Sequence, residues 1–289
     1  MRIYGKVLET FPKERVVKLK TNFKILYLYL QRKDFREYGP YFFEKPYLFL
    51  EIGENKKRIK NYMAYPVVMF IRIIQSNYYT FTKKRKIYFD MYENKRSVRK
   101  LINSPTNKMF IDLEFTMPPI YQSMPTMTEI IQYGIIIEDK NGNELFRDSS
   151  LINPSRPYNL NKNTLKFLSL SREDFKNAAP YSKFYNLMKR LMREYRPKIY
   201  VWGGNDILVM EHSFKYNKVP PLAVRANHVN LMNVIKNYNN TKDEMGLFQT
   251  YAIMANKEPV HQIHNALEDA QVTKEIFHLF KEIVNKDIY

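Results

Sequence analysis

One histidine and one aspartate stand five residues apart at the expected start of a C-terminal helix. Asn265 is a favourable N-cap, and Glu268, three residues later, completes a capping box in which Asn replaces Ser or Thr. His264 then precedes the cap and Asp269 is the fourth helical residue, two positions whose side chains lie next to each other. The pair offers a base beside a carboxylate, although an ordinary capped helix could contain the same residues.

Two further carboxylates, Asp112 and Glu114, lie in the otherwise apolar segment 109–116, which is typical of a strand. Residues at i and i+2 of a strand point to the same face. Two adjacent carboxylates are costly to bury unless cations neutralise them, and Mg²⁺ and Mn²⁺ prefer oxygen ligands. The strand therefore indicates a divalent-metal site, although one Asp-x-Glu pair is weak evidence when it stands alone.

A fourth candidate acid, Asp206, follows a second buried strand. Residues 198–202 predict that strand, and Gly203-Gly204-Asn205-Asp206 leads into a helix expected over 207–217. Acids just past a strand end lie where α/β sheets build their sites. Asp206 could equally be a simple helix cap.

The segments around these acids predict an α/β domain with a mixed central sheet. The Pro-containing segment 117–128 is expected to be a loop that either borders a substrate groove or connects two strands. The other expected elements are strands at 129–138 and 144–149 joined by a turn at 140–143, short helices at 163–168 and 172–178, a helix at 182–195, and the C-terminal helix.

The net charge of +18 is concentrated in the N-terminal third of the 289-residue chain. Residues 1–100 carry 24 Lys and Arg against 9 Asp and Glu, whereas residues 101–289 carry the remaining 23 against 20. A composition that had drifted without a partner would spread the charge evenly. The asymmetry favours a basic module for a polyanion, joined to a nearly neutral domain.

The basic module is expected to be a small β-rich barrel of the OB or cold-shock kind. A helix is expected at 32–43, and a polar, basic linker at 94–108 places the domains at 1–103 and 104–289. Short apolar-alternating runs predict its strands at 2–8, 15–19, 24–30, 46–51, 65–74 and 86–89.

This module contains 21 of the 42 Tyr and Phe residues, interleaved with Lys and Arg. Aromatic faces can stack bases, each worth roughly 1–3 kcal/mol, while basic side chains contact phosphates. At least half of the rings are expected in the core, among them Tyr27, Tyr29, Phe49 and Phe70. The basic run 83–86 is either solvated or a phosphate-binding rim. Nucleic-acid binding is favoured over a purely structural or protein-binding role.

The composition also limits the compartment and the class of protein. The absence of cysteine excludes disulfide partners and thiolate metal sites, and it fits a reducing cytoplasm. Neither a signal peptide nor a membrane span is expected, because the N-terminus has no apolar core and no 18-residue apolar stretch occurs. A soluble cytoplasmic protein with no membrane partner is therefore expected.

Three motifs in order make residues 108–284 resemble the DEDDh 3′–5′ exonucleases, a branch of the ribonuclease H-like fold. The motifs are Asp-x-Glu, Trp-Gly-x-x-Asp and His-x-Ala-x-x-Asp-Ala, and they begin at Asp112, Trp202 and His264. Segments 129–132 and 245–248 resemble the branch that contains histone-mRNA and RNA-interference exonucleases and KapD-like bacterial proteins. No comparable resemblance covers residues 1–100.

The resemblance implies a metal-dependent hydrolase that releases nucleoside 5′-monophosphates from a 3′ end. Two Mg²⁺ or Mn²⁺ ions, about 3.5–4 Å apart, are expected as cofactors. His264 is expected to be the general base, for which an ordinary pKa near 6.5 is suitable. Phe115, Thr116 and Trp202 are expected to contact substrate. The expected metal ligands are Asp112, Glu114, Asp206 and Asp269.

Three functions remain open at this level. Single-stranded RNA is favoured over DNA as the substrate only because of the branch resemblance, so a trimming or proofreading DNA exonuclease is the alternative. A catalytically silent nucleic-acid-binding adaptor is disfavoured, because it has no need to keep four acids and a histidine. His261 is a rival base, but its distance from Asp269 does not match the motif.

Overall fold

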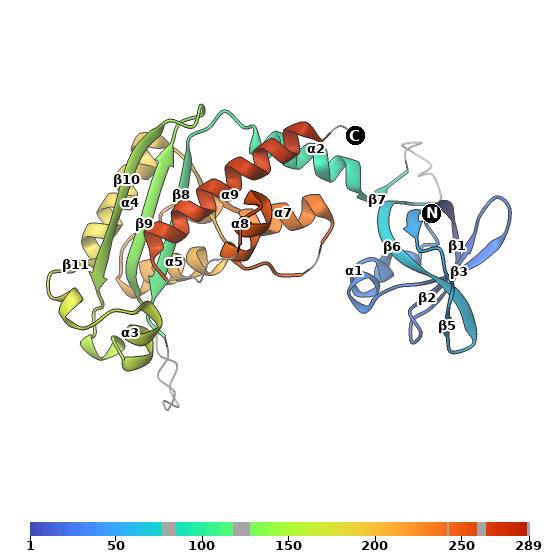
Figure 1. Ribbon diagram of the computed structural model, residues 1–289, viewed down its shortest axis with the longest axis horizontal. Helices are drawn as coiled ribbons and strands as arrows, with labels where there is room; N and C mark the ends of the chain where they lie inside the picture. The colour runs from blue at the N-terminus through green and yellow to red at the C-terminus, as the bar shows by residue number, and fades with distance from the viewer. Residues whose placement is uncertain (77–84, 118–127, 242, 259–263, 288–289) are drawn as a thin grey trace. The chain divides into compact units, whose positions relative to one another are not determined.

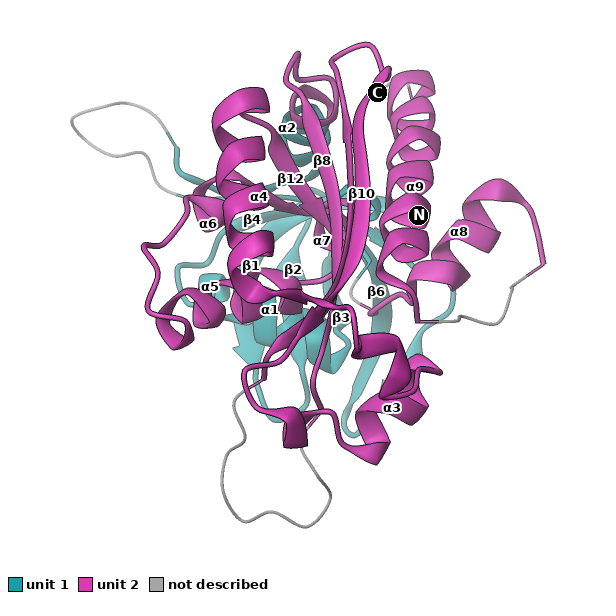
Figure 2. Cartoon of the chain, turned by 90° about the vertical axis from the view of Figure 1, so that its left-hand side faces the viewer, with its two compact units in different colours: residues 1–98, 237–242, 289 teal, residues 99–236, 243–288 magenta. Residues whose placement is uncertain are grey.

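The structure is a computed structural model that describes residues 1–76, 85–117, 128–241, 243–258 and 264–287 (Figure 1). Residues 1–98 with 237–242 and 289 form one compact unit, and residues 99–236 with 243–288 form the other (Figure 2). Within the described part of the chain, none of the helices has the length and apolar character needed to cross a membrane.

The first unit is a five-stranded barrel. The strand order is β1-β2-β3-β6-β4 and back to β1, with β3 and β6 parallel and the other neighbours antiparallel. The predicted small barrel of the OB kind is confirmed. Its strands are β1 (Arg2–Phe11), β2 (Val16–Lys20), β3 (Ile25–Tyr29), β4 (Tyr47–Ile52) and β6 (Tyr62–Ile74), with β5 (Lys57–Ile59) and β7 (Ile87–Asp90) added along β6.

Alternation of side chains along β3 and β4 separates the barrel core from its outer surface. In β4, Leu48 and Leu50 are fully buried while Phe49 between them is only half-buried. The prediction that Tyr27, Tyr29 and Phe49 are core residues is therefore wrong, because the leucines next to them take the inward positions. The same prediction is correct for Phe70, which is buried.

Helix α1 (Arg32–Phe42) lies between β3 and β4 in the chain and covers part of the barrel core. Its buried residues Tyr38 and Phe42 pack on Phe70, with ring centroids 4.3 and 6.3 Å away. Large aromatic side chains from one helix thus complete a core that the short strands alone would leave open.

Most of the segment predicted as a polar, basic linker at 94–108 is helical. Helix α2 spans Met91–Ile102, and the division between the two units falls inside it, between Val98 and Arg99. Asp90 caps the helix, because its Oδ1 accepts hydrogen bonds from the Tyr92 and Glu93 N–H groups. Burial of Val98 and Ile102, one turn apart, explains why a charged segment is nevertheless ordered.

The second unit is built on a mixed sheet, as predicted, and in the described part of the chain this sheet has six strands, two more than the sequence indicated. The strand order is β11-β10-β9-β8-β12-β13; β9 runs antiparallel to both β8 and β10, whereas β12 runs parallel to β8 and β13. The strands are β8 (Lys108–Phe115), β9 (Ile130–Glu138), β10 (Glu144–Asn153), β11 (Ala179–Pro180), β12 (Lys198–Val201) and β13 (His228–Asn230).

Helices cover both faces of this sheet, with α4 on one side and α9 on the other (Figure 2). The face of β8 that carries Ile111 packs in the core with α4 and α5. The opposite face carries Phe110, whose ring centroid lies 5.5 Å from that of Phe277 in α9. Alternation along β8 therefore turns Asp112 and Glu114 toward the α9 side.

The helices of this unit extend the predicted set. The expected helix at 172–178 is only a 3₁₀ turn, Glu173–Phe175, and helices α6, α7 and α8 had no counterpart in the sequence prediction. Among the described residues that follow β10, the α-helices are α3 (Lys162–Leu168), α4 (Tyr181–Tyr195), α5 (Asn205–Tyr216), α6 (Val224–Asn227), α7 (Leu231–Asn239), α8 (Leu247–Ala255) and α9 (Ala266–Lys286).

A glycine allows the start of α9 to rest directly on the sheet. Gly134 of β9 pairs with Asp112 of β8, and a Cβ atom at Gly134 would lie 2.2 Å from the carbonyl oxygen of Ala266. Because that neighbour is backbone, it cannot rotate away. The missing side chain at Gly134 thus permits the N-terminus of α9 to sit beside the acids of β8.

Replacement of Gly134 by Ala is therefore expected to destabilise the second unit by several kcal/mol, since the helix must move or the strand must shift. Thermal and urea unfolding of the full chain measure the loss. Gly246→Ala is the matched control, because its φ of −64° is ordinary and the nearest atom to its Cβ is 3.8 Å away. Equal stability of the two variants would contradict the close-approach argument.

Candidate active site

The five predicted catalytic residues line one cleft of about 630 Å³ in the second unit. Two come from β8, one from the first turn of α5, and two from the start of α9 and the residue before its cap. The residues are Asp112, Glu114, Asp206, Asp269 and His264. The fold thus brings together side chains that are up to 157 positions apart in the sequence, while their roles in catalysis stay predictions.

Asp206 is held by strand β8 rather than acting as a helix cap. The Leu113 N–H donates a 3.0 Å hydrogen bond to Asp206 Oδ1, and Gly204 is the N-cap residue of α5. The β8–β12 pairing has its last partners at Phe110 and Tyr200, so no ladder bond competes for the Leu113 N–H. Because the β8–β12 pairing ends before Leu113, the Leu113 N–H is available to hold Asp206 next to Asp112 and Glu114.

Asp269 and His264 are placed by the predicted helix cap. The Asn265 side chain accepts hydrogen bonds from the Leu267 and Glu268 N–H groups, at 3.1 and 3.2 Å, which confirms the N-cap. Gln132 of β9 adds a link to the sheet, because its Oε1 accepts a 3.3 Å hydrogen bond from the Ala266 N–H.

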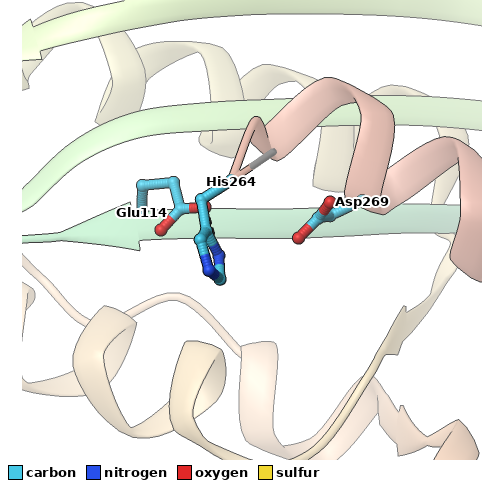
Figure 3. Close-up of side chains that lie close together, drawn as sticks. All are labelled: Glu114, His264 and Asp269. Atoms are coloured by element: carbon cyan, nitrogen blue, oxygen red, sulfur yellow. Dashed lines mark ion pairs between the residues drawn. The ribbon is translucent and has the colours of Figure 1, made fainter. Parts of the chain in front are cut away.

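Glu114, His264 and Asp269 face a common point from β8 and from the start of α9 (Figure 3). One ligand atom from each lies within 4.8 Å of the others, and His264 Nδ1 is 3.9 Å from Glu114 Oε1. Glu114 and Asp269 are buried, whereas the His264 side chain keeps 29% of its surface exposed. This geometry suits one metal ion, or a water molecule held between an acid and a base.

Burial and mutual repulsion make the acids resist ionisation. Burial is the main cause that raises the pKa of Asp112 well above its ordinary value, and the negative charges of Asp206, Asp269 and Glu114 add to the rise. Burial, followed by Asp269 and Asp206, raises the pKa of Glu114 to about 8. Burial also raises the pKa of Asp206 to about 6, although hydrogen bonds from backbone N–H groups oppose that rise.

The donor set fits divalent metal ions. Four carboxylates from three elements meet in one cleft, where burial and mutual repulsion raise the pKa values of Asp112 and Glu114. Oxygen-rich sites of this kind bind Mg²⁺ or Mn²⁺, which neutralise the charge and return the carboxylates to their ionised form. A divalent metal centre is therefore consistent with the residues present.

Phe167 is a cleft residue that the sequence analysis missed. Its ring stacks on His264, with centroids 3.8 Å apart and planes at 27°, and it stays 42% exposed. Helix α3 is anchored to the end of β8, since Asn161 Nδ2 donates to the Met117 carbonyl and Met117 N–H donates to Thr164 Oγ1. No sequence signal connects a phenylalanine of a seven-residue helix with a histidine 97 positions later.

The three predicted substrate contacts are placed differently. Phe115 and Trp202 line the cleft, and the Trp202 indole N–H donates to the Met245 carbonyl at 3.1 Å. Thr116 is buried outside the cleft lining, where its hydroxyl accepts a hydrogen bond from the Glu129 N–H. The side chain of Thr116 therefore supports the strand end rather than facing the cleft.

Because His264 precedes the helix cap rather than lying on the helix, we predict that it belongs to a mobile loop. Its ring is neither free of contacts nor fully enclosed, because Phe167 covers one face while part of the side chain remains accessible. His261 and most of the predicted loop 117–128 lie outside the described residues.

Comparison with known proteins identifies relatives of the second unit. The RNase_T family model, described as Exonuclease, matches residues 109–277, more than half of the chain. The probable 3′-5′ exonuclease KapD of Bacillus subtilis (strain 168) is 26% identical over 176 residues, which cover 60% of this chain and 84% of KapD.

Two solved structures share the fold of this unit. Each is 11% identical to this chain in sequence, has a TM-score of 0.54 and aligns with 63% of this chain. One shows 3′-end specific recognition of a histone mRNA stem-loop by a 3′-exonuclease. The other is the nuclease domain of 3′hExo, a DEDDh family member, bound to rAMP. The chain spans 64% of the former, which is less than two thirds of its length, and 93% of the latter.

Glu114 is expected to make the metal-free protein lose stability as the pH rises. Its folded pKa of about 8 lies above the ordinary 4.5, so the folded form keeps a proton that the unfolded form releases across this window. Glu114→Gln should therefore raise the Tm in EDTA at pH 8 by a few degrees, at about 2–4 °C per kcal/mol, with little effect at pH 4.5. Mn²⁺ should raise the wild-type Tm more than that of the variant.

Calorimetry of the metal-free and Mn²⁺-loaded proteins at both pH values measures these shifts. Glu282→Gln is the control, because Glu282 is an exposed acid on α9. A Glu114→Gln variant that is less stable than wild type in EDTA at pH 8 would contradict the repulsion argument.

Phe167→Leu is expected to release one face of the His264 ring. The loss of a ring current from an aromatic plane 3.8 Å away should move the His264 ring-proton signals downfield in the metal-free protein. Proton NMR, with the signals assigned by His264→Gln, measures the change. Phe115→Leu is the control from the same cleft, and unchanged His264 signals in Phe167→Leu would show that the stack does not form in solution.

Proposed function

The chain belongs to the RNase_T exonuclease family, and from this we propose that it hydrolyses single-stranded RNA from its 3′ end with divalent metal ions as cofactors. The products are nucleoside 5′-monophosphates. One observation carries the proposal: four acids and a histidine, in the order of the DEDDh motifs, line a single cleft of the family domain.

The enzyme class predicted from sequence, a 3′–5′ exonuclease of the DEDDh type, is confirmed by the family match and the relative KapD. A divalent-metal requirement follows from the same family and from the acidic cluster. The number and identity of the ions, two Mg²⁺ or Mn²⁺, belong to the proposal.

In this proposal the carboxylates of Asp112, Glu114, Asp206 and Asp269 hold the ions. When bound, such ions stabilise negative charge on the scissile phosphate and lower the pKa of the attacking water. The hydrogen bond from the Leu113 N–H to Asp206 and the packing of α9 at Gly134 fix the carboxylates before substrate arrives. The protein therefore needs little reorganisation in the transition state.

His264 takes the proton of the attacking water in this mechanism. Its imidazole lies at the cleft, 3.9 Å from Glu114, and its position before the helix cap leaves it outside the rigid helix. Phe167 supports the ring on one face and positions it. A general base of this kind contributes roughly 10²–10⁴-fold to the rate.

RNA is favoured over DNA on the basis of similarity. One of the solved structures with a matching fold is a 3′-exonuclease that recognises a histone mRNA stem-loop. The sequence segments at 129–132 and 245–248 also resemble the RNA-processing branch. A DNA exonuclease with the same chemistry is the second candidate, because none of the described residues that line the cleft separates a ribose from a deoxyribose.

The barrel supplies a second binding site for the strand in this proposal. Residues 1–100 carry a net charge of +15, and the tether between barrel and nuclease raises the effective concentration of a bound strand near the catalytic cleft. A cytoplasmic location, expected from the absence of cysteine, is proposed together with this function.

The proposal predicts metal-dependent laddering of a 5′-labelled single-stranded RNA from its 3′ end, faster than for DNA of the same sequence. EDTA should abolish the reaction. Asp112→Ala should lower the rate by at least about 10³-fold and His264→Ala by about 10²–10⁴-fold, because these variants remove a metal ligand and the general base. Gel analysis and chromatography of the released nucleotides measure both rate and product.

His212→Ala is the control for the histidine, since His212 is exposed on α5 and does not line the cleft. Faster cleavage of DNA would replace the RNA proposal by the DNA alternative. Absence of metal-dependent mononucleotide release from either substrate would refute an enzymatic role and favour a silent binding protein.

A further inference from the structure

We infer that the outer face of β1 and β4 is the surface on which the barrel binds single-stranded nucleic acid, by stacking bases on Tyr4, Phe49 and Tyr47. This surface is called the β1–β4 face below. The inference rests on the proposed function for the nature of the polymer, and it goes further by naming the residues and the strands that contact it.

Three aromatic rings form a continuous layer on the β1–β4 face. Tyr4 is paired directly with Phe49 across the two strands, and their ring centroids are 4.7 Å apart with planes at 30°. Tyr4 also stacks on Tyr47, at 5.7 Å and 23°. The near-parallel rings present a broad aromatic surface to solvent, and 41% of the surface of Tyr4 is exposed.

These rings are not needed to fill the barrel. The inward positions of β1 and β4 are taken by other residues, among them Val7, Leu48 and Leu50, which are fully buried. Cross-strand aromatic pairs do stabilise a sheet, typically by less than burial in the core does. Sheet stabilisation alone does not explain the cations that surround the rings.

The charges around the rings are those that a polyanion would require. Lys6 lies directly opposite Lys20 across β1 and β2, an arrangement that weakens strand pairing because like charges repel. The Arg85 guanidinium lies 5.3 Å from the Tyr47 ring centroid, and Arg72 is paired with Phe49 across β4 and β6. A bound phosphate chain would offset this repulsion.

The acids near this face are already neutralised. Glu51 lies at the end of β4, 3.8 Å from the Arg2 guanidinium. Asp90 is buried and forms a 2.7 Å ion pair with Arg72. The β1–β4 face therefore keeps a positive balance after its ion pairs are counted.

A second aromatic cluster on the barrel lies among charges that compensate one another. Phe11, Tyr27 and Tyr62 lie together, with the Phe11–Tyr62 and Tyr27–Tyr62 centroids 4.7 and 5.3 Å apart. Burial, then Glu14 and Glu9, raise the pKa of the Tyr62 hydroxyl, which shows that acids face this ring.

The cations beside that second cluster are engaged by the same acids. Lys60 donates a 2.9 Å hydrogen bond to Glu14, and Lys18 lies 3.8 Å from Glu9. Many five-stranded barrels of this kind bind oligonucleotides on the face of β2 and β3, to which Tyr27 belongs. In this chain the acids disfavour that face, and the β1–β4 face is the better match for phosphates.

The polymer on the β1–β4 face is single-stranded, because stacking on protein rings needs bases that are not already stacked in a duplex. Basic side chains beside the rings then contact the phosphates between successive bases. An acidic protein would also relieve the Lys6–Lys20 repulsion, but a single-stranded nucleic acid supplies in one chain both the phosphates for the cations and the planar bases for the rings.

The test is fluorescence anisotropy of a 5′-labelled 20-nucleotide RNA with the full chain in EDTA, which prevents cleavage. The variants are the double substitution Tyr4→Leu with Phe49→Leu, and the matched control Phe11→Leu with Tyr62→Leu. Loss of stacking should weaken binding by at least about fivefold per ring in the first variant only. Lys6→Gln with Lys20→Gln should also lower the slope of log affinity against log salt.

Circular dichroism and unfolding of each variant show that the barrel remains folded. Equal loss of affinity in both aromatic variants, no loss in the β1–β4 variant, or a duplex that binds as tightly as the single strand would each overturn the inference. Cleavage of a trinucleotide by the wild-type chain with Mn²⁺ tests the proposed function separately, because so short a substrate does not need the barrel.

Discussion

The close approach of helix α9 to strand β9 is the constraint on which the nuclease site depends. A side chain at Gly134 would collide with the backbone of Ala266, so only glycine allows the helix start to rest on the sheet. That contact lies opposite Asp112 in the strand pairing, and it places Asp269 one turn into the helix beside the same strand. The hydrophobic contact of Phe277 with the sheet stabilises the helix in this position.

The cost of this arrangement is electrostatic, and it explains the chemistry of the cleft. Carboxylates pressed together by packing raise one another's pKa, as at Asp112 and Glu114. The same repulsion that makes these carboxylates hold protons to a higher pH also makes the site favourable for divalent cations, which neutralise the charge. The fold of the second unit thus holds repelling carboxylates together at the place where an exonuclease binds metal ions. Backbone donors such as the Leu113 N–H keep these acids in position.

The barrel also holds like charges close together, but there the charges are positive. Its core is complete without Tyr4 and Phe49, and its strand pairing would be stronger without Lys6 opposite Lys20. On the β1–β4 face, outward rings occur together with an unfavourable cation pair, whereas the rings near Glu9 and Glu14 lie among compensated charges. Both units therefore keep unfavourable charge where a ligand of opposite charge would remove it.

The sequence by itself determined the local features of this protein. Two acids at i and i+2 of an apolar strand must share a face, and Asn265 must cap the helix that follows it, because both follow from backbone geometry and nearest neighbours. Tertiary structure decided which of two alternating sets faces the core, so Phe49 lies outside. It also decided that 94–102 is helical and that Phe167 meets His264, since long-range packing sets these contacts.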